Sequence, residues 1–142
     1  MARPMYETEA DRRKEQALAN AFAEHGYDFY KLPIQYRLDF VVFKDNKAKA
    51  FIEVKHRNVR LLQYDTAMVS LSKVIQARML TQHTGLPAYL LNVYIDNIAR
   101  FDFAGDYKLG KGGRSDRGDA QDADICAYFP IGGATVLRSS KV

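Results

Sequence analysis

Apolar positions recur with a helical period in two parts of this chain. The first part, residues 9–25, precedes Gly26, and glycine often ends a helix in the left-handed conformation. The second part, residues 66–83, precedes a Gly-Leu-Pro sequence that stops a helix. We therefore expect two helices. The buried stripe of the first would be Leu18, Ala21 and Phe22. That of the second would be Met68, Leu71, Ile75 and Met79, widened by Val74 and Leu80.

Short apolar runs rich in β-branched and aromatic residues predict strands between and after these helices. Gly132 and Gly133 predict the turn of a C-terminal hairpin. Residues 105–124 are rich in Gly, Asp, Lys and Arg, and we expect them to form a long exposed loop. This order predicts one α/β domain over residues 1–142, with a central mixed β-sheet flanked by helices. The expected strands are 27–32, 38–43, 50–54, 88–95, 98–103, 125–131 and 134–138.

The strands at 38–43 and 50–54 form the most informative pair, because charged residues interrupt them. If they are joined by a five-residue loop centred on Asn46, residues equidistant from Asn46 face each other, and Asp39 lies opposite Glu53. Directly facing residues have Cβ atoms roughly 4.5–5.5 Å apart. Alternation along a strand places Lys55 on the same face as Glu53. The spacing therefore predicts that two carboxylates and one ammonium group converge on one patch of sheet.

Composition is that of an ordinary globular protein. The 142 residues are 47% hydrophobic and 27% charged, and the net charge of +4 is compatible with a polyanionic partner without demonstrating one. The single cysteine, Cys126, excludes an internal disulfide and a zinc site built from several cysteines. No apolar segment has the length of a signal peptide or a membrane span. We expect a soluble, cytoplasmic protein.

Two carboxylates at close range repel each other unless a cation lies between them. Mg²⁺ or Mn²⁺ suits such oxygen ligands, and can activate water and stabilise charge on a phosphate. Lys55 would then orient the nucleophile or neutralise the phosphate. The alternative is a structural salt bridge between Lys55 and Glu53, with Asp39 partly exposed. Glu15 lies on the inward side of the first helix, and its position alone fits either a solvated flank or an additional acid of the site.

The order Asp39, thirteen residues, then Glu53-Val54-Lys55 resembles the core motif of the PD-(D/E)xK nuclease superfamily, with leucine where the proline of that name often stands. The chain is similar to archaeal-type Holliday junction resolvases and related phage nucleases. Their opening helix carries a glutamate eleven residues before a glycine, as Glu15 stands before Gly26. The sequence HTGLPAYLLNVYIDNIARFDF resembles the segment after their second helix. The resemblance covers roughly residues 9–103.

This resemblance implies a restriction-endonuclease-like core and a Mg²⁺- or Mn²⁺-dependent endonuclease. It implies that Asp39, Glu53 and the backbone carbonyl of Val54 bind the metal. Lys55 corresponds to the catalytic lysine, and Glu15 to a helix-borne acid that could hold the metal through water.

The resemblance also implies a partner, namely DNA, in particular branched DNA. It further implies a homodimer that is phage-encoded and acts in the host cell. Two alternatives stay open: the same fold acting on single-stranded, flapped or nicked DNA or on RNA, and a non-catalytic nucleic-acid or protein binding module. Residues expected to contact nucleic acid are Arg57, Arg60, Lys73 and Gln76.

Overall fold

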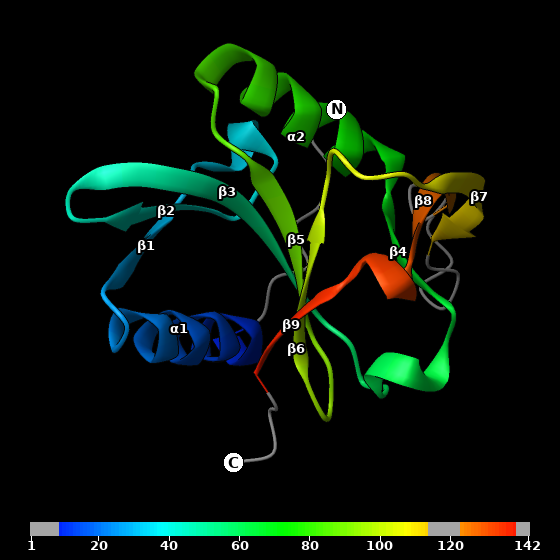
Figure 1. Cartoon of the computed structure of the whole chain (residues 1–142), viewed down its shortest axis with the longest axis horizontal. Coiled ribbons are helices and arrows are strands. Elements are labelled where there is room, and N and C mark those ends of the chain that lie inside the picture. Colours follow the sequence, from blue (N-terminus) through cyan, green and yellow to red (C-terminus); the bar gives the residue numbers. More distant parts are fainter. Residues whose placement is uncertain (1–8, 114–122, 139–142) are drawn as a thin grey trace.

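The chain folds around a six-stranded mixed β-sheet that has α1 on one face and α2 on the other (Figure 1). The computed structural model describes residues 9–113 and 123–138. Its helices are α1 (Glu9–Ala23) and α2 (Leu71–Thr84), with short 3₁₀ turns η1 (Ile34–Tyr36), η2 (Leu61–Gln63) and η4 (Ile131–Gly133). Its strands are β1 (Tyr27–Lys31), β2 (Phe40–Lys44), β3 (Lys47–His56), β4 (Thr66–Ser70), β5 (Ala88–Val93), β6 (Ile98–Asp102), β7 (Lys108–Gly113), β8 (Ala123–Pro130) and β9 (Thr135–Arg138).

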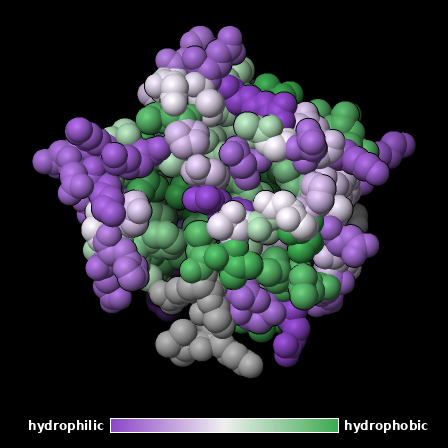
Figure 2. Space-filling model, viewed as in Figure 1, coloured by the Kyte–Doolittle hydropathy of each residue, from purple (hydrophilic) through white to green (hydrophobic). Residues whose placement is uncertain are grey.

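The large sheet has the strand order β1-β2-β3-β5-β6-β9, and the small sheet has the order β4-β8-β7. Within the large sheet only β3 and β5 are parallel, because β4 and α2 return the chain to the start of β5. The predicted mixed sheet flanked by helices is therefore confirmed. Figure 2 shows this face of the molecule with hydrophilic side chains gathered over the β2–β3 turn and a hollow near its centre.

The central strands are buried on both faces, which explains their nearly continuous apolar sequences. Ile52 and Val54 of β3 pack on the α1 side together with Leu18. Phe51 belongs to the second core, on the α2 side, with Val74. Side chains at even and odd positions of β3 thus separate onto the two faces, as the geometry of a strand requires.

The β2–β3 hairpin keeps the predicted facing but not the predicted loop. Phe40 pairs with Ile52, as expected for residues equidistant from Asn46. The connection is a two-residue turn, not a five-residue loop, because Asp45 and Asn46 both adopt positive φ (53° and 62°). A bulge after Val42 shifts the pairing by one residue and restores the predicted alignment.

The second helix begins later than predicted. Residues 66–70 form β4, which pairs with β8 more than 50 positions along the chain, and Ser70 caps α2 through its side-chain oxygen. The predicted stripe is wrong at Ile75 and Met79, which are about half exposed (53% and 47%), whereas Leu71 packs on the core as predicted. Val74 and Ala77 occupy the buried face.

The glycine-rich stretch after residue 105 is only partly the expected loop. Residues 108–113 form β7, and residues 114–122 lie outside the described part of the chain. A Cβ atom on Gly110 would lie 2.8 Å from the ring of Tyr128, and one on Gly112 would lie 2.8 Å from Cys126 Sγ. These glycines therefore reflect close packing of β7 on β8.

The expected C-terminal hairpin does not form. The turn at Ile131–Gly133 carries the chain from β8, in the small sheet, to β9, which pairs with β6 at the edge of the large sheet (Figure 1). The two strands are adjacent in sequence but belong to different sheets. Among the described residues, no helix is long and apolar enough to cross a membrane.

Candidate active site

Strand β3 carries a row of charged side chains on the face that α2 covers. Glu53 and Lys55 alternate with the apolar Ile52 and Val54, which face α1, and Arg57 continues the row just beyond the strand. Neighbours in this row are two residues apart, or roughly 6.6 Å along a strand. The row lies at the middle of the large sheet, between β2 and β5.

Glu53 is almost fully buried, with 2% of its surface exposed. Its Oε2 lies 3.3 Å from Lys55 Nζ and its Oε1 lies 3.5 Å from Lys73 Nζ. Oε1 nevertheless accepts no hydrogen bond from any described residue. Burial and, secondarily, the charge of Asp39 raise the pKa of Glu53, while Lys55 and Lys73 oppose the increase.

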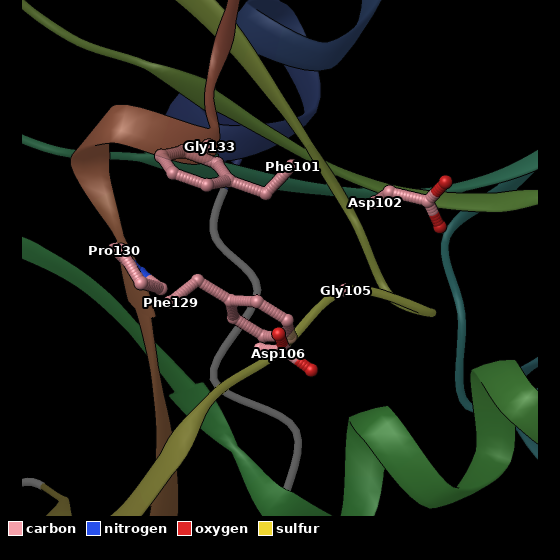
Figure 3. Close-up of a pocket in the computed structure, with 7 residues that line it drawn as sticks. All are labelled: Phe101, Asp102, Gly105, Asp106, Phe129, Pro130 and Gly133. Atoms are coloured by element: carbon pink, nitrogen blue, oxygen red, sulfur yellow. The ribbon is translucent and has the colours of Figure 1, made fainter.

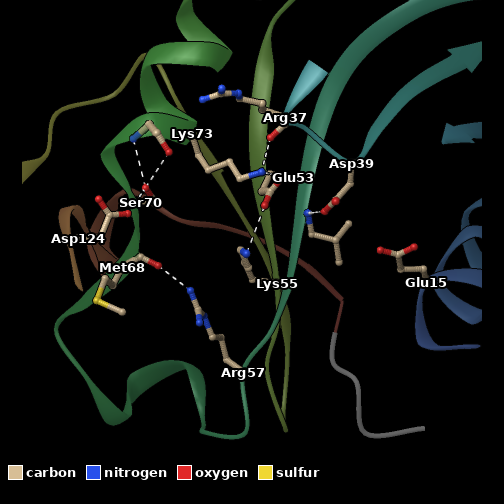
Figure 4. A network of polar contacts seen from close by, with 12 residues as sticks. Glu15, Arg37, Asp39, Glu53, Lys55, Arg57, Met68, Ser70, Lys73 and Asp124 are labelled. Carbon is tan, nitrogen blue, oxygen red and sulfur yellow. Dashed lines mark hydrogen bonds and ion pairs between the residues drawn. The ribbon is translucent and has the colours of Figure 1, made fainter. Parts of the chain in front are cut away.

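Asp39 lies immediately before β2 and is half-buried. Its Oδ2 accepts a hydrogen bond of 2.8 Å from the backbone N–H of Val54. This bond links Asp39 to the residue between Glu53 and Lys55 and fixes the carboxylate at the hairpin (Figure 4). The predicted convergence of Asp39, Glu53 and Lys55 is therefore found.

Lys73 lies on the first turns of α2 and points at the buried carboxylate (Figure 4). Its Nζ also donates a hydrogen bond to the carbonyl of Arg37, just ahead of Asp39. The sequence predicted Lys73 as a nucleic-acid contact, whereas the structure places it against Glu53. Gln76 lies one turn further along α2 and is half-buried, and its side chain makes no hydrogen bond to a described residue.

Glu15 extends from α1 in the direction of Asp39 (Figure 4). Both of its carboxylate oxygens accept hydrogen bonds from Lys31 of β1, at 3.0 and 2.8 Å. In the described part of the chain, no three His, Cys, Asp or Glu residues come close enough together to hold a metal ion. The structure thus brings Asp39 and Glu53 together, but it does not join Glu15 to them.

Arg57 and Arg60 differ in their surroundings. The guanidinium of Arg57 is half-buried and donates a 2.7 Å hydrogen bond to the carbonyl of Met68 in β4 (Figure 4). Burial lowers the pKa of Arg57 below its ordinary value. Arg60 is exposed at the start of η2. The basic segment after β3 is therefore not simply a solvated loop.

A hard divalent cation fits the donors of this site. Glu53 supplies a buried carboxylate oxygen without a hydrogen bond, a group that is costly unless a ligand compensates it. Asp39 and the peptide group of Val54 lie at the same point of the hairpin. All three supply oxygen, the atom that Mg²⁺ and Mn²⁺ prefer.

Sequence reasoning missed two residues beside this site. Nothing in the sequence around Lys31 indicates that it forms an ion pair with Glu15, since only the pairing of β1 with β2 brings Lys31 close to this site. Asn92 lies next to Lys55 in the β3–β5 ladder and is 1% exposed. A polar residue inside the apolar run 88–95 was its only visible signal.

A separate pocket of about 240 Å³ opens between the start of β7 and the end of β8 (Figure 3). Its walls include Phe101 and Phe129, and none of the predicted site residues lines it. We therefore assign no part of the predicted chemistry to this pocket.

Comparison with known proteins identifies the family. Residues 1–135 match the model of the family described as "Phage putative PDDEXK endonuclease". Because the match covers nearly all of the chain, the protein belongs to this family of phage PD-(D/E)xK endonucleases. A search of the curated proteins gives no match.

Among solved structures, the chain is similar to Hjc of the archaeal hyperthermophile Archaeoglobus fulgidus, a Holliday junction resolvase. The TM-score is 0.53 at 18% sequence identity, over 66% of this chain and 77% of that chain. At this identity the similarity shows a shared fold. The salt bridge between Lys55 and Glu53 is expected whether the pair is structural or catalytic, so it does not distinguish these interpretations. The family match favours the catalytic interpretation.

Proposed function

We propose that this protein is a Mg²⁺- or Mn²⁺-dependent endonuclease that hydrolyses DNA phosphodiesters at Asp39, Glu53 and Lys55. The observation that carries the proposal is the state of Glu53. This carboxylate is buried at 2% exposure, one of its oxygens accepts no hydrogen bond, and it lies beside Lys55 within a nuclease family. A buried carboxylate of this kind suits a cation better than it suits a stable core.

Asp39, Glu53 and the Val54 carbonyl would hold the metal. When bound, the metal supplies a Lewis acid that lowers the pKa of water and offsets charge on the phosphate. Lys55 is 38% exposed, so its ammonium group can reach a phosphate or an incoming water while it remains next to Glu53. Lys73 lies 3.5 Å from Glu53 Oε1, and its charge partly opposes the increase in the pKa of Glu53 that burial causes.

Branched DNA is the substrate that we propose. The fold is shared with Hjc, a Holliday junction resolvase, and the chain carries a net charge of +4. Half-buried Arg57 continues the row of charges beyond Lys55, exposed Arg60 follows it, and both would bind the DNA backbone. A homodimer that acts inside the infected host cell completes the proposal.

The test is a panel of end-labelled substrates: a four-way junction, a flap, single-stranded DNA, linear duplex DNA and single-stranded RNA, each incubated with Mg²⁺, Mn²⁺ or EDTA. We expect cleavage only with the divalent metals and a preference for the junction. The Asp39→Asn variant should lose cleavage, and an Asp106→Asn variant serves as the control because Asp106 lies on the far pocket and is exposed.

Equal cleavage in EDTA would contradict the metal requirement, and full activity of Asp39→Asn would contradict the site. Cleavage of RNA or of single strands in preference to junctions would replace the substrate but retain the chemistry. Sedimentation of the protein with and without junction DNA tests the homodimer separately.

A further inference from the structure

A second cavity, of about 350 Å³, lies beside the catalytic row, and its lining includes Arg57 and Arg60, which we propose above to bind the DNA backbone. It opens between the segment after β3, strand β4 and the end of β5. Ligand pockets commonly have volumes of roughly 300–1,000 Å³, so this cavity is large enough for one small ring system. Its polar and aromatic lining includes Arg57, Arg60, Tyr64, Asn92, Tyr94 and Tyr128.

The inner wall of the cavity contains an amide whose oxygen lacks a hydrogen-bond partner among the described residues. Asn92 is 1% exposed, and its Nδ2 donates a 2.9 Å hydrogen bond to the hydroxyl of Tyr94. Its Oδ1 accepts no hydrogen bond from the described residues. A buried acceptor left in this state is unfavourable unless a ligand completes it. The ligand must therefore present an N–H or O–H donor.

Arg57 supplies a half-buried cation to the same cavity. Arg57 donates to the carbonyl of Met68, and no ion pair with a carboxylate is found for it in the described part of the chain. Its half-buried guanidinium is thus available to a negatively charged group at the cavity. The exposed Tyr64, at 60% exposure, stands beside it with an aromatic face open to solvent.

The cavity is directly connected to the proposed reaction centre. Asn92 pairs with Lys55 in the parallel ladder between β3 and β5, and the two side chains lie on the same face of the sheet. Arg57 follows Lys55 by two positions in the row of charges. A nucleotide next to the cleaved phosphodiester would therefore reach this cavity.

We propose that the cavity binds the base of one unpaired nucleotide of the DNA substrate, adjacent to the cleaved bond. Asn92 completes its hydrogen bonding with an N–H group of the base, the tyrosines contact the ring, and Arg57 binds the nucleotide's phosphate. A paired base cannot enter, because its donor edge is occupied and its ring is stacked. The cavity would thus favour junctions, flaps and bulges over intact duplex. This inference rests on the proposed nuclease function and specifies how the same site recognises its substrate.

The experiment measures affinity, so that it does not depend on cleavage. Two fluorescein-labelled duplexes are compared by anisotropy with the full-length protein, with Ca²⁺ in place of Mg²⁺. One duplex carries a single unpaired adenosine, and the other carries an abasic unit at the same position. Stacking and hydrogen bonding of one base should make the wild-type protein bind the first duplex about tenfold more tightly.

Asn92→Leu, which retains the size but not the acceptor, should reduce this ratio to near one. Tyr64→Ala should reduce it as well, and because Tyr64 is exposed this variant tests the idea even if Asn92→Leu does not fold. Asn20→Leu is the matched control, since Asn20 is exposed on α1 and, among the described residues, its side chain forms a hydrogen bond only with Gln16. The binding ratio of this variant should stay that of wild type.

A wild-type ratio near one would overturn the inference, as would an unchanged ratio in Tyr64→Ala or in a folded Asn92→Leu. Cleavage of the same duplexes in Mg²⁺ is recorded separately. Selective binding without cleavage would support base binding in the cavity and contradict the proposed nuclease activity. Cleavage without selective binding would support the nuclease activity and contradict base binding in the cavity.

Discussion

Replacing Glu53 with glutamine should stabilise the metal-free protein while it removes activity. The exchange keeps the shape of the side chain and deletes its charge. Glu53 is 2% exposed and its Oε1 accepts no hydrogen bond, so the ionised form is poorly solvated in the fold. Active sites commonly retain such unfavourable groups because the chemistry requires them.

The expected gain in the free energy of unfolding is about 1 kcal/mol near pH 8. An unsatisfied buried polar group costs roughly 1–3 kcal/mol, and more when it is charged. The lysines at 3.3 and 3.5 Å recover part of this cost for the wild-type protein. After the substitution both lysines can be hydrated, since they are 38% and 27% exposed. For a chain of this size the gain corresponds to a rise in Tm of about 3 °C.

The pH dependence has a definite sign. The pKa of Glu53 is raised above its ordinary value of 4.5 in the folded protein, mainly by burial. The protonated side chain therefore contributes stability that is fully present below pH 4.5 and is lost as pH rises through the raised pKa. The advantage of Glu53→Gln should be small at pH 4 and largest at alkaline pH.

Urea unfolding followed by far-ultraviolet circular dichroism in EDTA, at several pH values, measures this difference. Glu24→Gln supplies the matched control, because Glu24 is exposed and the same chemical change there should alter stability by less than about 0.5 kcal/mol. A Glu53→Gln protein that is less stable than wild type at pH 8 would refute the reasoning, as would an advantage that grows toward low pH.

Three further predictions follow from other parts of the molecule. Gly112→Ala should lower the free energy of unfolding by about 1–3 kcal/mol in the same urea assay, because the new Cβ atom would lie 2.8 Å from Cys126 Sγ. Gly132→Ala is the control and should be nearly neutral, because its Cβ atom would have no atom within 4 Å beyond its chain neighbours. Glu15→Gln should lower the cleavage rate while leaving DNA affinity within about twofold, and an equal loss of both would assign Glu15 to DNA binding. Arg60→Ala should weaken DNA binding and reduce the slope of log Kd against log salt by about 1, and an unchanged slope would exclude a phosphate contact.

The facing of Asp39 and Glu53 could be predicted because the apolar runs define the two strands and the polar link locates the turn. The predicted loop was nevertheless too long, since nothing in the local pattern shows that Asp45 and Asn46 both adopt positive φ. A bulge after Val42 compensated for that error. Bulges respond to packing across the whole sheet, and they leave little trace in the order of residues.

The start of α2 could not be predicted from local periodicity. Residues 66–70 become a strand because β8 pairs with them from a distant part of the chain, and such contacts override local preference. The same small sheet converts the glycine-rich segment at 108–113 into β7. The helix therefore begins at Leu71 rather than Thr66. That Lys73 on this helix lies against Glu53 is known only from the structure.

Family resemblance supplied Glu15 as an acid of the site, a position that spacing left undecided. The structure pairs Glu15 with Lys31 and does not bring it to Glu53, so its catalytic role stays a prediction. Asn92 illustrates the opposite case, in which a single polar residue in a buried strand gains meaning only when the ladder places it beside Lys55.

The most direct test of the central claim is the cleavage rate of a labelled four-way junction in Mg²⁺ under single-turnover conditions. Lys55→Met and Glu53→Gln should each lower the rate about 100- to 1,000-fold while the proteins stay folded, and Glu24→Gln should cleave like wild type. If Lys55→Met and Glu53→Gln both cleave at the wild-type rate, Glu53 and Lys55 form only a structural salt bridge and the catalytic site lies elsewhere.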